Sequence, residues 1–181
     1  FMAASTAAGI KYQDRKDMAM LYSEVPCKAA GTFTTNIVKA APVKWDQNVV
    51  YNQPNSQAVV VNAGIANACT GKPGMDCCKA EAEHAGKLLG IPAEAVLVAS
   101  TGVIGMQLKM DKLKEGVVKL AEAKAPGLEA GHMAAKAIMT TDTVSKEVAV
   151  QFDVDGVTVT VGGMCKGSGM IHPNMCTMLG F

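Results

Sequence analysis

Three segments of the chain place hydroxyl, lysine and glycine residues at the ends of apolar runs. They are VASTGVIG at 98–105, MTTDT at 139–143 and GGMCKGSGMIHPNMCTMLGF at 162–181. Loops that are held by buried elements are where binding and catalytic residues gather. A strand that ends in Thr101-Gly102 also makes backbone amides available to a ligand. We therefore expect a functional site that draws on all three segments.

The third segment suggests two kinds of chemistry. Lys166 precedes Gly167-Ser168-Gly169, as in a phosphate-binding loop, but Cys165 stands where such a loop needs glycine. Thr177 follows an extended, proline-containing approach. A threonine hydroxyl becomes a nucleophile when a base lies beside it, and the amine of an N-terminal threonine is such a base. Taken alone, however, a threonine in an apolar strand more often bonds to the backbone.

The cysteines and histidines indicate no metal site. No pair of cysteines has zinc-ligand spacing, and two adjacent cysteines on a helix point about 100° apart. We expect buried, reduced thiols and histidines that are exposed or support the structure. The residues concerned are Cys27, Cys69, Cys77, Cys78, Cys165, Cys176, His84, His132 and His172.

Composition narrows the class of protein and its partners. The chain has 181 residues, of which 49% are hydrophobic but only 4% aromatic, so small aliphatic side chains must fill the core. The net charge is +1 and Arg15 is the only arginine, which argues against a nucleic-acid surface. No apolar run approaches the roughly 20 residues that span a bilayer, and we expect a cytoplasmic protein.

The apolar periodicity predicts a mixed α/β (α+β) fold, a layered sandwich of β-sheet and helices in one domain. Gly90 is expected to end the first helix, and Asp155-Gly156 to turn a hairpin. The predicted order is β-β-β-α-β-α-α-β-β. Strands are expected at 18–22, 29–33, 58–62, 95–100, 147–154 and 157–161, and helices at 71–89, 110–124 and 128–138.

The same segments resemble the α-chain of the bifunctional ornithine acetyltransferase family of arginine biosynthesis, also called glutamate N-acetyltransferase. The resemblance covers almost the whole chain. It rests on AAGIKY, DMAM, CKAAGTFTTNIVKAAPV, QAVVVNAGIANACTG, ASTGVIG, AKAIMTTDT and GGMCKGSGMIHPNMCTML, in that order. It implies the self-processing N-terminal-nucleophile fold of that family. Residues 1–176 would be the α-chain region and 177–181 the start of a β-chain.

The resemblance also implies roles for individual residues. The family cleaves itself within Ala-Thr-Met-Leu, so cleavage here would fall between Cys176 and Thr177, with cysteine in place of alanine. Thr177 would be the nucleophile of both cleavage and acetyl transfer. Thr101 and Gly102 match the family's oxyanion pair, and Thr140 and Lys166 match substrate-binding positions. For Asp142, we expect local capping or orientation of a site hydroxyl.

For partners and cofactors, the resemblance implies a β-chain, an α2β2 heterotetramer and small amino-acid substrates. It implies no metal and no cofactor, with acetyl-CoA as a second possible donor.

Two alternatives stay open at the level of sequence. An N-terminal-nucleophile aminopeptidase or amidase shares the self-cleavage but hands the acyl group to water. A homologue that is never cleaved would act as a non-catalytic binding subunit. An acceptor assay separates the first alternative from acetyl transfer, and the intact mass separates the second.

Overall fold

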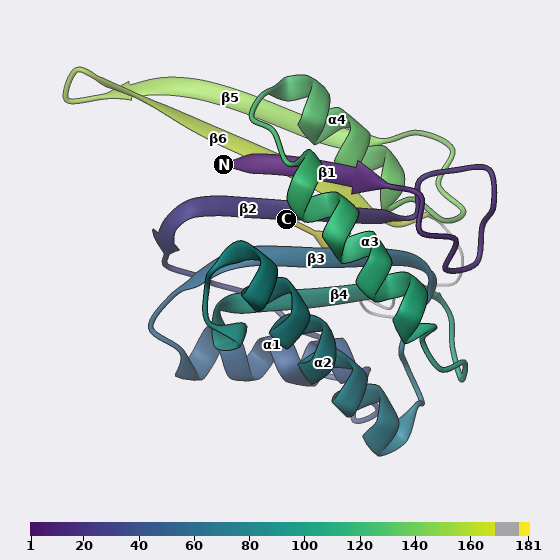
Figure 1. Cartoon of the computed structure of the whole chain (residues 1–181). Helices are drawn as coiled ribbons and strands as arrows, with labels where there is room; N and C mark the ends of the chain where they lie inside the picture. Colours follow the sequence, from purple (N-terminus) through teal and green to yellow (C-terminus); the bar gives the residue numbers. More distant parts are fainter. Residues whose placement is uncertain (169–177) are drawn as a thin grey trace.

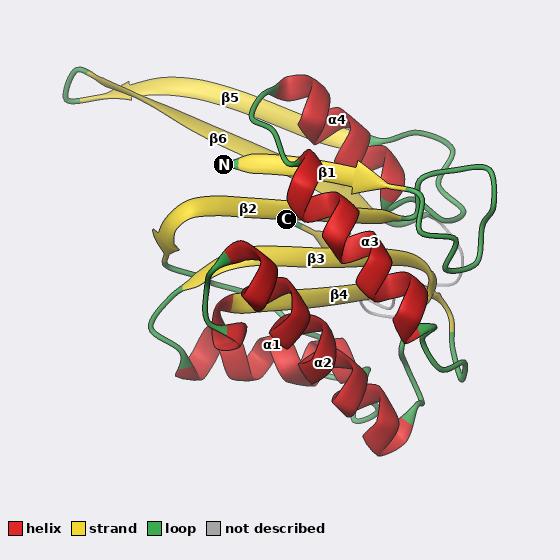
Figure 2. Ribbon diagram, in the orientation of Figure 1, coloured by secondary structure: helices red, strands yellow, loops and turns green. Residues whose placement is uncertain are grey.

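A four-stranded sheet in the order β1-β2-β3-β4 lies at the centre of the structure (Figures 1 and 2). This computed structural model describes residues 1–168 and 178–181. Three antiparallel strands are followed by one that is parallel to its neighbour. A parallel pair needs a long crossover, and α2 (Gly71–Leu89) lies in it. The strands are β1 (Met2–Thr6), β2 (Met18–Cys27), β3 (Ser56–Ile65) and β4 (Val96–Val103).

Three helices, α1 (Ala41–Asn52), α2 and α3 (Met110–Ala123), pack on one face of this sheet. Alternate strand residues such as Met20, Val60 and Val98 meet the apolar stripes of the helices there. Leu113 and Leu120 of α3 are fully buried, and burial of each such side chain contributes about 1.5–3 kcal/mol. This layer fixes β3 and β4, whose ends carry the residues of interest.

The other face of the sheet contacts α4 (Leu128–Ala137) and a second sheet. Ala19, Val61 and Ala99 pack there against alanines of α4, so the layers approach closely with few aromatic side chains. The second sheet has the antiparallel order β5-β6-β7. Its strands are β5 (Lys146–Val154), β6 (Val157–Lys166) and β7 (Leu179–Gly180).

Most elements expected from the sequence are present. The helix predicted over 71–89 has those bounds, and Gly90 ends it in the left-handed conformation, with φ of 70°. The hairpin turn is also confirmed, because Asp155 and Gly156 both have positive φ, at 49° and 80°. The strand expected at 58–62 is part of β3, which is buried on both faces, since Val60 and Val61 belong to opposite cores.

Other expectations are wrong. Residues 29–33 form no strand. They lie exposed or half-buried between β2 and α1, where Phe33 packs edge-on against Tyr51 of α1 in place of strand pairing. The prediction also missed β1, α1 and β7. Pro42 lies in the first turn of α1, a position that proline fits because its missing N–H has no partner there in any case. The observed order of the named strands and α-helices is β-β-α-β-α-β-α-α-β-β-β.

Within the described residues, no helix is long and apolar enough to cross a membrane.

Candidate active site

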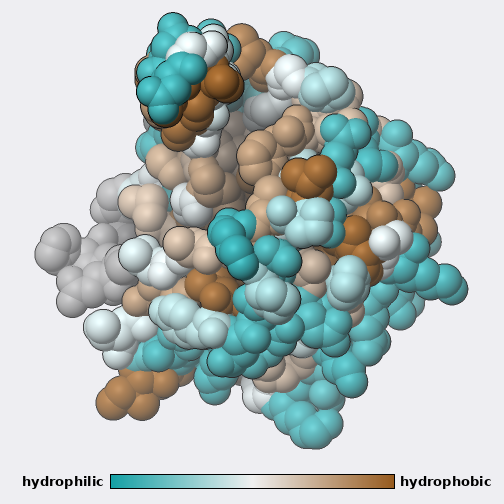
Figure 3. Space-filling model, turned by 90° about the vertical axis from the view of Figure 1, so that its left-hand side faces the viewer, coloured by the Kyte–Doolittle hydropathy of each residue, from teal (hydrophilic) through white to brown (hydrophobic). Residues whose placement is uncertain are grey.

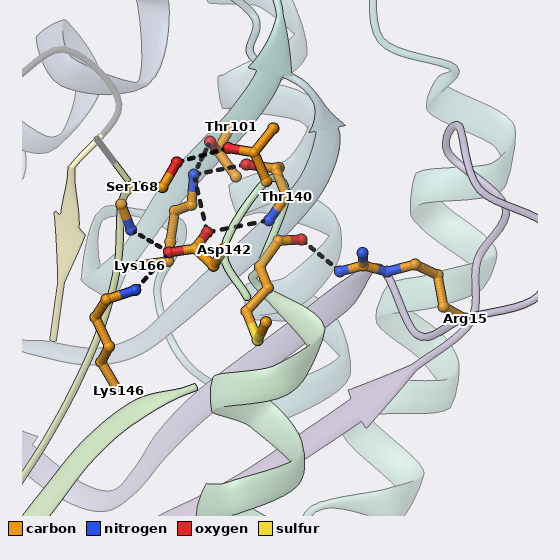
Figure 4. A network of polar contacts seen from close by, with 10 residues as sticks. Arg15, Thr101, Thr140, Asp142, Lys146, Lys166 and Ser168 are labelled. Carbon is orange, nitrogen blue, oxygen red and sulfur yellow. Dashed lines mark hydrogen bonds and ion pairs between the residues drawn. The ribbon is translucent and has the colours of Figure 1, made fainter. Parts of the chain in front are cut away.

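Lys166, the last residue of β6, brings the three chemistry-bearing segments together (Figure 4). Only 3% of the residue is exposed. Its Nζ donates hydrogen bonds to Thr101 Oγ1 at 3.1 Å and to Thr140 Oγ1 at 2.8 Å. Burying an ammonium group is costly unless it is paired and hydrogen-bonded. This lysine is therefore part of a built polar site and is not a solvated turn residue.

The end of β4 supplies Thr101 and Gly102. Thr101 is fully buried, and Gly102 has a φ of 133°, which side-chain-bearing residues rarely adopt. A Cβ atom at Gly102 would lie 2.2 Å from the carbonyl carbon of Gly64, its partner on β3. Glycine is thus required where the strand ends, directly beside the Thr101 hydroxyl.

Asp142, in the loop between α4 and β5, holds the site in place. Its Oδ1 accepts hydrogen bonds from Lys146 Nζ and from the backbone N–H of Gly167, both at 2.8 Å. Its Oδ2 accepts one from the backbone N–H of Thr140 at 3.3 Å and lies 3.8 Å from Lys166 Nζ. One carboxylate therefore connects the Thr140 loop to both β5 and β6.

The charges of this cluster leave an excess of one positive charge. Burial lowers the pKa of Lys166, and the nearby Asp142 carboxylate opposes that shift. Burial raises the pKa of Asp142, but hydrogen bonds from Lys146, Gly167 and Thr140 and the charge of Lys166 outweigh it and lower the pKa to about 2. Asp142 is then ionised at neutral pH beside two ammonium groups, which favours an anionic group on a ligand.

Arg15 supports the same loop from outside the cluster. Its guanidinium donates a hydrogen bond to the Met139 carbonyl, next to Thr140 (Figure 4). The guanidinium also lies 4.7 Å from the centre of the Tyr12 ring. No pattern in the sequence indicates this role, because 124 residues separate Arg15 from Met139.

The structure brings Thr101, Gly102, Thr140 and Lys166 into one place, as the resemblance implies. Two further predicted site residues lie outside the described residues, namely Cys176 and Thr177. The same holds for His172. Local capping understates the role of Asp142, which contacts three segments. Asp142 lies in a loop and Lys146 begins β5, so their four-residue spacing is not the spacing of a helical pair and gave no signal in the sequence.

The remaining cysteines and histidines take no part in this cluster within the described residues. Cys78 is buried as expected, whereas Cys69 is exposed, contrary to expectation, because it lies in the loop before α2. In residues 1–168 and 178–181, no group of three metal-binding side chains occurs. His132 contacts Glu147 on β5, consistent with a structural role.

Comparison with known sequences gives a consistent family. The sequence profile of the ArgJ family matches residues 2–181. The "Arginine biosynthesis bifunctional protein ArgJ" of Symbiobacterium thermophilum is 52% identical over 100% of the chain and 45% of that relative. The protein of the same name from Thermotoga neapolitana is 50% identical over 92% of the chain and 42% of that relative. The chain thus spans less than half the length of these curated relatives.

Solved structures agree. The ArgJ crystal structure from Bacillus halodurans superposes with a TM-score of 0.89 at 43% identity, over 98% of this chain and 90% of that one. The ornithine acetyltransferase of Mycobacterium tuberculosis, solved with ornithine, gives 0.89 at 46% identity, over 95% of this chain and 90% of that one. With its mixed α/β fold, the chain belongs to the ArgJ family.

Proposed function

We propose that this chain is the N-terminal part of an acetyltransferase that moves the acetyl group of N-acetylornithine to glutamate. The observation that carries this proposal is the direction of the hydrogen bonds at Lys166. An ammonium group can only donate, so Thr101 Oγ1 and Thr140 Oγ1 are acceptors toward Lys166. Each hydroxyl therefore keeps its own hydrogen to donate elsewhere. Thr101 is thus prepared to donate to a developing oxyanion, as the oxyanion pair of this family requires.

The proposed nucleophile is Thr177, which lies outside the described residues. One residue separates it from Leu179, and Leu179 pairs with Lys166 across β7 and β6. In the sequence, Thr177 therefore comes just before the strand that pairs with the lysine-bearing end of β6.

The proposed reaction has two half-reactions after self-cleavage between Cys176 and Thr177. The Thr177 hydroxyl attacks the acetyl carbonyl of N-acetylornithine while its free amine takes the hydroxyl proton. Thr101 Oγ1–H and the Gly102 amide stabilise the negative oxygen. The C–N bond then breaks, the ornithine amine leaves with a proton, and an acetyl ester remains on Thr177. The glutamate amine attacks this ester and regenerates the hydroxyl.

The charge of the site suits both substrates. N-acetylornithine and glutamate each carry an α-carboxylate, and the excess positive charge around Lys166 favours such an anion. The Mycobacterium tuberculosis relative was solved with ornithine, the product of the first half-reaction. We assign Thr140 and Lys166 to substrate binding on this ground.

Lengths of the relatives support two chains. The chain covers 90% of each solved chain but only 42–45% of the two curated relatives. The solved chains are thus about half as long as the curated proteins. We propose that self-cleavage gives this enzyme a second chain of comparable length, and that the two assemble as α2β2.

Initial-rate kinetics of the complete protein test the proposal. With both substrates varied, double-reciprocal lines should run parallel, because an acetyl-enzyme separates the two half-reactions. Intersecting lines would contradict it. Release of acetate to water at the same rate with and without glutamate would indicate an amidase. The same assay with acetyl-CoA in place of N-acetylornithine determines whether it is a second donor.

Replacement of the nucleophile gives an independent test. Thr177→Ala should abolish both cleavage and transfer, as the intact mass and the acceptor assay would show. Transfer that survives this substitution would exclude Thr177 as the nucleophile. A wild-type chain that stays uncut under native conditions would support the non-catalytic subunit.

A further inference from the structure

The β5–β6 hairpin carries an apolar face that the described residues leave open. Its two-residue turn joins strands in which Val150 lies opposite Val161 and Phe152 opposite Val159. Side chains of directly opposed residues lie on the same face of a sheet. Seven apolar side chains therefore share one face, and they belong to Val148, Val150, Phe152, Val154, Val157, Val159 and Val161.

Their exposure is unusual for a folded domain. Six of the seven are 47–67% exposed, and Val159 is half-buried. Hydrophobic residues gather on one side of the hairpin end that projects toward the viewer in Figure 3. The opposite face is polar toward the tip, with Gln151 and Thr160. At its base that face carries Met164, which packs into the core with α4. Contiguous apolar patches of this kind mark interaction surfaces.

The free edge of β6 adjoins this face. Phe181 and Met164 exchange two backbone hydrogen bonds, both at 2.9 Å, so Met164 directs its N–H and C=O toward β7. The backbone N–H and C=O groups of successive residues in a strand point to alternate sides, so those of Thr160 and Gly162 point to the same side of β6 as those of Met164. No described strand pairs with them there. An unpaired edge of this kind is a template for another strand.

The register of β7 indicates what adds to this edge. Pairing descends along β6 from Lys166 with Leu179 to Cys165 with Gly180, and then to Met164 with Phe181. The next residues of a continuing strand would meet Gly163, Gly162, Val161 and Thr160 in turn. The curated relatives are more than twice as long as the region they share with this chain.

We propose that the polypeptide following Phe181 in the complete protein extends β7 along β6 and covers the apolar face of the hairpin. The proposal rests on the proposed function only for its assumption that such a polypeptide exists. It assigns the hairpin as a docking surface between the two halves of the enzyme. Cleavage before Thr177 would leave the halves joined through this extended sheet.

Residue-resolved amide exchange tests the strand pairing. In the complete protein, the amides of Gly162 and Thr160 should exchange about as slowly as those of Val159 and Val161, which point to β5 and serve as internal controls. Exchange of Gly162 and Thr160 at least about 10-fold faster than these controls would overturn the proposal. Protection of Gly162 and Thr160 that rises with protein concentration would assign the edge to a second copy instead.

A pair of variants tests the apolar face. In the complete protein, Val150→Lys should weaken the association of the two cleaved chains at least about 10-fold in native mass spectrometry. Gln151→Lys, one residue away on the opposite face, should leave it unchanged. Equal effects of the two would refute docking through this face. Because exchange is measured whether or not the chain is cut or active, failure of the docking proposal is distinguishable from failure of the proposed reaction.

Discussion

The pairing of Asp142 with Lys166 should be measurable as a coupling energy in a double-mutant cycle. The carboxylate and the ammonium lie 3.8 Å apart. At an effective dielectric constant near 20, two charges at that distance attract by about 4 kcal/mol. Desolvation offsets most of this. The fall in the pKa of Asp142 from 3.8 to about 2 corresponds to only about 2 kcal/mol for all its partners together. We therefore expect a coupling of about 1 kcal/mol to Lys166 alone.

The cycle combines Asp142→Asn with Lys166→Met. Asp142→Asn alone should lower the free energy of unfolding by about 2–4 kcal/mol, because it leaves Lys166 buried without its counter-charge. Urea denaturation can be followed by the fluorescence of Trp45, the only tryptophan, whose indole donates to the Val96 carbonyl at 2.9 Å. If the effects of the two substitutions on the free energy of unfolding are additive within error, the carboxylate does not stabilise the lysine and the proposed pairing is wrong.

The same carboxylate predicts a dependence on pH. Its pKa is lowered in the folded state, so its stabilising contribution is present above pH 3.8 and is lost as the pH falls through about 2. The wild-type chain should lose about 2 kcal/mol of stability across this range from this group. Asp142→Asn should show a correspondingly smaller loss in acid titrations. If the variant loses as much stability in acid as the wild-type chain, the lowered pKa assigned to Asp142 is wrong.

Three further predictions concern single positions. Gly102→Ala should lower the free energy of unfolding, measured in urea, by at least about 3 kcal/mol, because its Cβ would clash with Gly64. Gly131→Ala in α4 is the control: its Cβ would meet open space, and the free energy of unfolding should rise by about 0.5–1 kcal/mol. Arg15→Gln should lower kcat/KM of the complete enzyme about 10-fold by releasing the Thr140 loop, and an equal effect of Lys16→Gln would exclude this specific role. Burial raises the pKa of Asp46 from 3.8 to about 8, so the folded state should lose stability as the pH rises from 3.8 toward 8. Asp46→Asn should reduce that loss in urea denaturation at several pH values. The same dependence of stability on pH in the wild type and the variant would contradict the raised pKa.

The sequence predicted those elements that are determined by residues close together in the chain. The apolar periodicity over 71–89 with Gly90 after it predicted α2, and Asp155-Gly156 between alternating β-branched residues predicted the hairpin. The prediction failed where strand formation depends on contacts between distant parts of the chain. Residues 29–33 are apolar enough for a strand, but they pair with neither sheet, and Phe33 packs against Tyr51 of α1 instead.

The site shows the same division. The resemblance identified Thr101, Thr140 and Lys166, and the structure joins them through hydrogen bonds that span up to 65 residues. The contributions of Arg15 and Asp142 depend on which backbone groups lie within reach of their side chains. No spacing in the sequence encodes such contacts, because they arise only when α4, β5 and β6 pack together.

Mass spectrometry of the complete protein after incubation with N-acetylornithine tests whether Thr177 carries the acetyl group during transfer. We expect a chain that begins at Thr177 and carries one added acetyl group on that residue. The group should disappear when glutamate is supplied, with formation of N-acetylglutamate. A cleaved, active protein that transfers acetyl groups without ever carrying one on Thr177 would exclude the proposed acetyl-enzyme.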